Sequence, residues 1–283
     1  MSAATTQPMI DDEFLDYEDI YEAEWPAGFP RDSKVDEAKQ ALKDFFAKNS
    51  EDVFYMQQLE VFFEPVFHWI TSTAINELID EGFLKSEERP LLGSTTIKFV
   101  FNKGHRYYKR QMYEKLQIVR EYSRPEIASA CGRQAEVLFF NALADRGFSS
   151  HGQNTNEFGS KRWTETDHDL DFIVERDGKV YGAEVKNKWG YIDKDELDIK
   201  LRMCNFLGIK PLFIMRGSPK HYNYMIIKAG GYAMIFEAQI YPFGQKDLVK
   251  RIKEKLGLKA DCPRAIPDGI IDRFMGWHNT QKA

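Results

Sequence analysis

The feature that most constrains the fold is a hairpin in the stretch HDLDFIVERDGKVYGAEVKNK, residues 168–188. Two apolar-rich segments flank Asp177-Gly178, a dipeptide typical of two-residue hairpin turns. Centring the turn on this dipeptide fixes which residues oppose each other across the strands. Because side chains alternate along a strand, four charged residues share one face in two opposed pairs, Asp171 with Glu184 and Asp169 with Lys186.

The other face of this hairpin is apolar and predicts packing against helices. It carries Leu170, Phe172, Val174, Ala183 and Val185. The charged residues therefore lie on one side of a sheet whose other side is core.

Two opposed carboxylates at this spacing predict a site for a cation. Directly opposed residues have Cβ atoms ~4.5–5.5 Å apart, so Asp171 and Glu184 would repel each other unless a positive charge lay between them. Oxygen ligands of this kind favour Mg²⁺ or Mn²⁺. Lys186 would then activate a water or stabilise charge on a phosphate. The alternative is a salt-bridged sheet face, with Asp169 paired to Lys186 and Glu184 to a neighbour such as Lys188.

Asp171, a turn and then Glu184-Val185-Lys186 resembles the PD-(D/E)XK nuclease superfamily, which includes restriction endonucleases and Holliday-junction resolvases. The resemblance covers residues 125–257 and implies an αβββαβ core with a mixed central sheet, if a first strand lies near 148–154. It implies that the metal is held by Asp171, Glu184 and the backbone carbonyl of Val185, and that Lys186 is the catalytic lysine.

The same resemblance assigns roles to residues outside the hairpin. Glu136, in GRQAEVLFF, matches the acid on the first core helix, and Lys200 in DIKLRM matches a polar position on the later helix, where it would contact nucleic acid. The Pro-Asp pair of the family is replaced by His168-Asp169-Leu170-Asp171, so Asp169 is either a second ligand or a partner for Lys186.

Residues 36–105 show a different order of elements. The sequence predicts a helix from Val35, a short helix at 56–63, a break at Pro65, a helix at 68–81, a strand at 91–101 and a turn at 102–104. This order resembles a winged-helix DNA-binding domain, whose second helix enters the major groove. The resemblance implies exposed reading residues on that helix, namely His68, Thr71, Ser72, Thr73 and Asn76. The alternative is a small helical domain that contacts protein.

Charge distribution favours a nucleic-acid partner more than the net charge of −5 does. Residues 1–35 contain nine acids and two bases, a local charge of −7, which leaves +2 for the remainder. Residues 97–124 contain eight bases and two acids. The residues expected to contact nucleic acid from this segment and beside the hairpin are Lys98, Lys103, Arg106, Lys109, Arg110 and Lys188. A solvated helix face is the alternative for the basic segment.

The sequence thus predicts an α/β protein with an N-terminal winged helix-turn-helix domain and a C-terminal restriction-endonuclease-like domain. The predicted divisions are an acidic flexible arm at 1–35, the winged helix at 36–105, a helical linker at 106–124, the nuclease domain at 125–260 and a tail at 261–283. Three isolated cysteines and the lack of a long apolar run predict a reduced, cytoplasmic protein without a membrane segment.

The predicted function is a Mg²⁺- or Mn²⁺-dependent DNA endonuclease. A homodimer is expected if both strands are cut at once. Two alternatives remain. One is a catalytically silent nuclease fold that only binds DNA, and the other is a nuclease for RNA or branched DNA.

Overall fold

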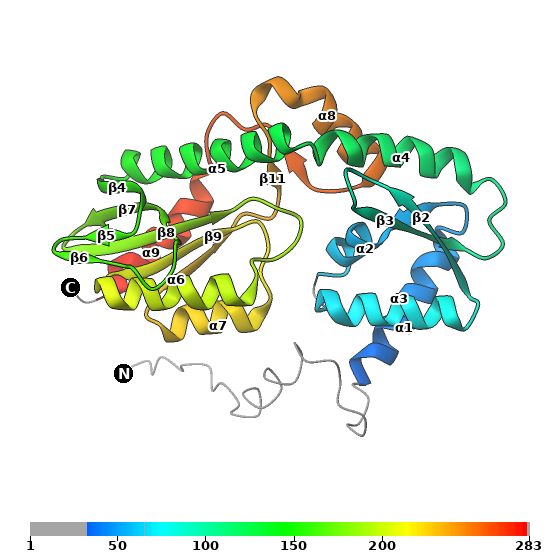
Figure 1. The fold of residues 1–283 in the computed structure, drawn as a ribbon, viewed down its shortest axis with the longest axis horizontal. Helices are drawn as coiled ribbons and strands as arrows, with labels where there is room; N and C mark the ends of the chain where they lie inside the picture. Colours follow the sequence, from blue (N-terminus) through cyan, green and yellow to red (C-terminus); the bar gives the residue numbers. More distant parts are fainter. Residues whose placement is uncertain (1–32, 65, 282–283) are drawn as a thin grey trace, which may run out of the picture.

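The computed structural model describes residues 33–64 and 66–281. Over these residues the protein is a mixed α/β structure with nine α-helices, a mixed five-stranded sheet and a smaller antiparallel sheet (Figure 1). The predicted arm falls almost entirely outside the described residues, as does the predicted break at Pro65. No helix among the described residues is long and apolar enough to cross a membrane.

The N-terminal part is built on a three-stranded antiparallel sheet with strand order β1-β3-β2. Its elements in chain order are α1 (Ser33–Lys48), β1 (Val53–Tyr55), α2 (Met56–Phe62), α3 (His68–Asp80), β2 (Leu84–Pro90) and β3 (Thr96–Asn102). The predicted helices are confirmed, except that α1 begins at Ser33, which places the predicted boundary after residue 35 inside the helix.

The predicted strand at 91–101 was wrong at its start. Leu91 lies in the turn between two strands, and the preceding segment LKSEERP forms β2 at the edge of the sheet. Edge strands tolerate charged residues and proline, because one of their sides has no neighbouring strand to pair with. The charge of this segment concealed the strand.

The buried faces of α1, α2 and α3 form the core of this part. Apolar residues recur at helical spacing in α1, so that one stripe of the helix faces inward. The fully buried members of this core include Leu42, Phe46, Leu59, Ala74, Ile75, Leu78 and Val100.

Two helices, α4 (Tyr108–Tyr122) and α5 (Pro125–Asp145), run almost end to end along one side of the molecule (Figure 1). The break between them lies where Pro125 predicts it. The buried face of α4 shares a core with β1, β3 and the segment after residue 245, which contains α8 (Lys246–Arg251) and the π-helical turn η3 (Ile252–Leu256). The segment predicted as a linker therefore joins the two parts through a common core.

The C-terminal part is built on the five-stranded sheet with strand order β10-β9-β8-β7-β4. Strands β4, β7 and β8 are antiparallel, whereas β8, β9 and β10 are parallel. After α5 the chain order is β4 (Ser149–Thr155), β7 (Leu170–Arg176), β8 (Lys179–Lys186), α6 (Lys194–Leu207), β9 (Lys210–Met215), α7 (Lys220–Lys228) and β10 (Tyr232–Ile235). Short elements that the sequence did not predict are β5 (Glu157–Phe158), β6 (Lys161–Arg162), β11 (Gln239–Ile240), η2 (Phe243–Gln245) and β12 (Ala260–Asp261).

Helices cover both faces of this sheet. One face packs on α5 and on α9 (Asp268–Thr280), and the other face packs on α6 and α7. The predicted tail is thus wrong as a separate segment, because Ile271 and Phe274 of α9 are buried in the core of the sheet. The sequence also predicts a short helical piece around 270–275, and this piece lies within the 13-residue helix α9.

The predicted hairpin register is confirmed over the paired part of β7 and β8. Phe172 lies opposite Ala183, as the central Asp177-Gly178 turn requires. Both turn residues have positive φ angles, 52° and 71°, which is the backbone conformation of the predicted turn type.

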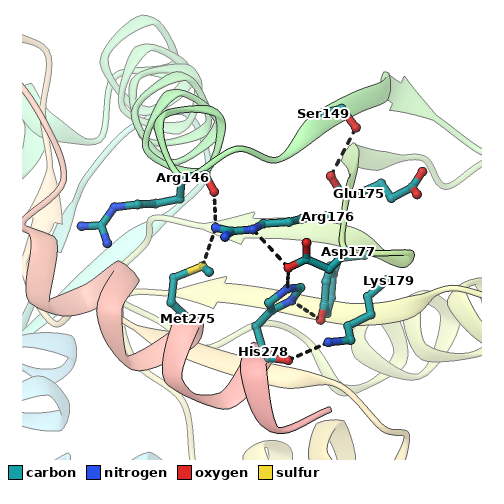
Figure 2. Close-up of polar contacts among 9 residues, drawn as sticks. Arg146, Ser149, Glu175, Arg176, Asp177, Lys179, Met275 and His278 are labelled. Carbon is teal, nitrogen blue, oxygen red and sulfur yellow. Dashed lines mark hydrogen bonds and ion pairs between the residues drawn. The ribbon is translucent and has the colours of Figure 1, made fainter. Parts of the chain in front are cut away.

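Helix α9 anchors the turn end of this hairpin (Figure 2). The His278 ring is fully buried, with 2.8 Å between Nδ1 and the Tyr181 hydroxyl and 3.2 Å between Nε2 and Asp177 Oδ2. Lys179 donates a hydrogen bond to the backbone carbonyl of His278. The turn is therefore held in place at the opposite end of the hairpin from the charged residues.

Candidate active site

The charged residues lie where β7 and β8 separate. The pairing of the two strands ends at Phe172 and Ala183, one position before Asp171 and Glu184. The backbone N–H of Val185 instead donates to the Asp171 carboxylate, with 2.6 Å between N and Oδ2. The Asp171 side chain is thus the hydrogen-bond acceptor for this N–H, a role that a backbone carbonyl of the neighbouring strand has in a continuous ladder.

This separation corrects two details of the predicted hairpin faces. Asp169 precedes β7, so its predicted pairing with Lys186 across a ladder is wrong. Leu170 packs with Ile173 and Cys204, on the side of the sheet that faces α6, and not with Phe172 as predicted. Both differences follow from the end of the ladder, because strict alternation holds only while the strands stay paired.

Glu184 is the most buried acid of the site, with 2% of its surface exposed. Two lysines neutralise it. Lys186 Nζ lies 2.6 Å from Oε1, and Lys200 Nζ lies 2.6 Å from Oε2. Lys200 also donates to the backbone carbonyl of Asp169. The predicted contact of Lys200 with nucleic acid is not available to this buried side chain.

A glycine lets α6 bring Lys200 so close to the sheet. A Cβ atom at Gly182 would lie 2.7 Å from Leu170 Cδ1 and 2.9 Å from Ile209 Cδ1, closer than such atoms approach, and in tight contact at 3.0 Å with Cys204 Sγ of α6. Gly182 shares its face of β8 with Glu184, since side chains alternate along the strand. The missing side chain therefore allows a helix to press against the strand that carries the candidate acid.

Lys186 is half-buried and bridges two acids. Besides Glu184 it contacts Glu196 on α6, with 2.8 Å between Nζ and Oε1. Burial acts to lower the pKa of Lys186, but the contacts with Glu184 and Glu196 outweigh burial and raise it. Lys186 is therefore a fixed positive charge at the site.

Asp171 and Glu136 complete a group of acids that affect one another. Burial and the charge of Glu184 raise the pKa of Asp171 to about 7. Burial and Glu184 also raise the pKa of Glu136, which reaches the site from α5. The structure thus brings Glu136, Asp171, Glu184 and Lys186 together, and Asp169 contributes its backbone carbonyl at the edge of this group.

The donor set fits a hard divalent cation in its chemistry. Burial and the Glu184 charge raise the pKa values of Asp171 and Glu136, and a cation bound among these carboxylates would relieve that crowding. Within residues 33–64 and 66–281, however, no group of three or more His, Cys, Asp and Glu side chains is arranged as a metal site. The expected ligands are two carboxylates, Asp171 and Glu184, and one backbone carbonyl, that of Val185.

Comparisons with protein-family models, with curated proteins and with solved structures found no match to this chain.

The expected reading helix, α3, has its N-terminal end against the C-terminal part. The His68 ring stacks on Tyr191, with 3.9 Å between ring centroids, and Thr71 is fully buried, so the expected exposure of these two residues was wrong. Ser72 donates to Glu60, whereas Asn76 is exposed and accepts from Lys98. Thr73 is half-buried. The exposed residues of α3, Asn76 and Asp80, therefore lie in the second half of the helix.

The predicted basic segment divides into surface and core residues. Lys103, Arg106, Lys109 and Arg110 are exposed, and Arg110 pairs with Glu114 at 3.0 Å. Lys115 is buried instead, where it donates to the backbone carbonyl of Val53, and burial lowers its pKa to about 8. Lys188 is half-buried, with 3.5 Å between its Nζ and Asp193 Oδ2.

Sequence reasoning missed the contact that joins the two parts beside the site. Arg216, directly after β9, is buried and donates to the backbone carbonyls of Lys188 and Trp189 and to the carboxylate of Glu64. The only local signal is an arginine that follows the apolar run PLFIM. Glu196 was missed as well, because it lies on a helix that sequence alone does not place beside β8.

Proposed function

We propose that this chain is a metal-dependent DNA endonuclease of the PD-(D/E)XK type, with its DNA held by a winged-helix-like N-terminal domain. The observation that carries the proposal is the meeting of Asp171, Glu184 and Lys186 where β7 and β8 separate, with Glu136 beside them. Two acids that can bind a metal and a lysine that can stabilise charge on a phosphate are groups that metal-assisted phosphodiester hydrolysis can use.

Topology supports the same proposal. The order α5, β4, β7, β8, α6, β9, with an antiparallel trio followed by a parallel strand, agrees with the αβββαβ core that the resemblance implies. The N-terminal order of helix, strand, two helices and two strands agrees with a winged helix. In that arrangement the loop 91–95 between β2 and β3 is the wing.

Each residue of the site has a role in this proposal. Asp171, Glu184 and the Val185 carbonyl would hold Mg²⁺ or Mn²⁺, with Asp169 close enough in sequence to add a ligand. The bound metal would supply charge neutralisation and a more acidic water. Lys186 would stabilise negative charge on the phosphate, and Lys200 would hold Glu184 in position from the side facing α6.

In this proposal, exposed lysine and arginine side chains bind the DNA backbone. Lys103 follows β3, Arg106 lies in the next turn, and Lys109 and Arg110 begin α4. Contacts of this kind neutralise phosphates without reading sequence. Asn76 of α3 and Lys98 of β3, which are bonded to each other, form a polar group beside the exposed part of α3.

The decisive experiment measures nicking of supercoiled plasmid with Mg²⁺, with Mn²⁺ and with EDTA. The wild type is compared with Glu184→Gln and with Glu175→Gln, a control on the outer part of the same hairpin. We expect cleavage by the wild type and the control, its loss in Glu184→Gln, and none in EDTA. Equal cleavage by Glu184→Gln would place the active site elsewhere.

One observation favours a second candidate, a DNA-binding protein with a silent nuclease fold. Both oxygens of Glu184 are already bonded to lysines, so the buried charge is balanced without a metal. This candidate predicts tight binding of duplex DNA that is unchanged by EDTA, with no cleavage of plasmid, single-stranded, branched or RNA substrates in either metal.

A further inference from the structure

A cavity of about 630 Å³ lies at the joint between the N-terminal and C-terminal parts. Its walls come from α2, the α4–α5 junction, the loop 187–193 and the segment after β10. The side chains that matter here are Gln57, Tyr122, Lys188, Trp189, Tyr191 and Tyr241. We infer that this cavity receives one unpaired nucleotide of the substrate strand, an inference that rests on the proposed nuclease function.

The cavity begins next to the candidate active site. Asn187, which follows the catalytic candidate Lys186, is part of its wall, and Lys194 at the start of α6 is another part. A strand whose phosphate lies at Lys186 would therefore have a neighbouring nucleotide at the cavity.

The wall is fixed before any ligand binds. The buried Asn187 amide donates to the backbone carbonyls of Cys131 and Ile240 at 2.9 and 2.7 Å, and its oxygen accepts from the Ile240 N–H at 2.9 Å. Arg216 holds the carbonyls of Lys188 and Trp189 on the same loop. A site that is ordered in advance loses less entropy when a ligand enters.

The chemistry of the lining fits a nucleotide. Four tyrosines and Trp189 line the cavity; most of these rings are buried, and Tyr191 is the more exposed aromatic surface for a base. Lys188, whose side chain is 44% exposed, provides a cation for a phosphate. Trp189 is 3% exposed, and its indole lies against the Tyr241 hydroxyl, so the two rings form a fixed part of the wall.

The size of the cavity then indicates the class of substrate. Cavities of ~300–1,000 Å³ accommodate small ligands, a range that includes a single nucleotide. A paired base enters such a cavity only after it is flipped out of the duplex, which costs unstacking and unpairing free energy that an unpaired base does not require. The substrate would therefore carry an unpaired nucleotide beside the cleaved phosphate, as single-stranded or branched DNA does.

The test uses the full chain and DNA that contains 2-aminopurine, whose fluorescence reports stacking on aromatic side chains. A 12-nucleotide single strand and the same sequence as a duplex are titrated in EDTA, so that binding is measured without cleavage. The variants are Lys188→Ala and Ala128→Phe, since Ala128 is an exposed residue of α5 on the cavity wall. Ala144→Phe, the same change at another exposed position of α5, is the control.

We expect quenching with the single strand but not with the duplex. We also expect Ala128→Phe to weaken single-strand affinity at least tenfold, while Ala144→Phe leaves it unchanged. Equal affinity of Ala128→Phe and the wild type for the single strand would overturn the inference. Plasmid nicking with no quenching would also overturn it and leave the nuclease intact. Quenching without cleavage of any substrate would keep the nucleotide site and remove the nuclease.

Discussion

Lys200 of α6 and Glu184 of β8 form a buried ion pair, with 2.6 Å between Nζ and Oε2. Their side chains are 5% and 2% exposed, so neither charge has bulk water as an alternative partner. Removing one member of such a pair leaves the other charge buried without a partner. This costs far more stability than is lost when the whole pair is replaced by apolar residues. The pair therefore dominates the energetics of the site.

Replacing Lys200 with Met should lower the free energy of unfolding by about 2–3 kcal/mol, less than the full cost of a stranded charge because Lys186 still contacts Glu184. Urea unfolding in EDTA measures the loss. The double variant Lys200→Met, Glu184→Gln should recover most of it. Lys188→Met, at a more exposed lysine, is the control. Additive losses in the double variant would contradict this account.

Asp171→Asn should stabilise the protein, and more so at high pH. The pKa of Asp171 is raised to about 7. In the wild type, the contribution of this carboxyl to the free energy of unfolding is therefore present at low pH and is lost as the pH rises through 7. Asparagine cannot ionise, and a gain of about 2 kcal/mol at pH 8 is expected relative to pH 4. Asp177→Asn should show the opposite trend at lower pH, because the His278 hydrogen bond lowers the pKa of Asp177 and its contribution is lost only as the pH falls below about 4. Unfolding measured in EDTA from about pH 2 to pH 8 covers both ranges.

His278→Ala should lower the free energy of unfolding by about 3 kcal/mol, because it empties a fully buried space and leaves the Tyr181 hydroxyl unpaired. His278→Phe should cost about half as much, since it restores the packing but not the hydrogen bond. His151→Ala, at an exposed residue, should change stability by less than about 0.5 kcal/mol. Equal losses for His278→Ala and His278→Phe would show that packing contributes little here.

Arg216→Met should loosen the loop 187–193 from the N-terminal part. It removes the donors to the carbonyls of Lys188 and Trp189 and the partner of Glu64. Limited proteolysis should then cut this loop faster than in the wild type. Arg202→Met, which removes a half-exposed partner of Glu165, should leave the cutting rate unchanged. Unchanged proteolysis of Arg216→Met would show that other contacts hold the loop.

Lys109→Ala should weaken duplex binding and reduce its salt dependence. An exposed lysine that contacts one phosphate contributes about one unit to the slope of log affinity against log salt. Fluorescence anisotropy at salt concentrations from roughly 50 to 200 mM measures this slope. Lys228→Ala on α7 serves as the control. An unchanged slope for Lys109→Ala would remove the start of α4 from the DNA surface.

Local patterns in the sequence predicted most elements and the hairpin register. Asp177-Gly178 requires a particular turn, and the turn determines which residues of β7 and β8 are opposed. The same reasoning brought Asp171 and Glu184 to one place. The same reasoning was wrong for Asp169, because the sequence does not show where two strands cease to pair.

The remaining differences arise from contacts between distant segments. Lys200 is buried because α6 packs on β8 at Gly182, and the start of α3 is covered because it docks against Tyr191. Neither packing partner is adjacent in the sequence. Helix α9 was underestimated for the same reason, since Phe274 is buried by strands encoded far earlier in the chain.

Arg216 bonds to the loop after β8 and to Glu64 just before α3, and this contact has a consequence for where a substrate would be cut. It ties the proposed DNA-reading helix to the strand that carries Glu184 and Lys186. For the proposed nuclease, the offset between a bound DNA element and the broken bond would then be a property of the protein. Products would end at a constant number of nucleotides from the element, whatever sequence lies between.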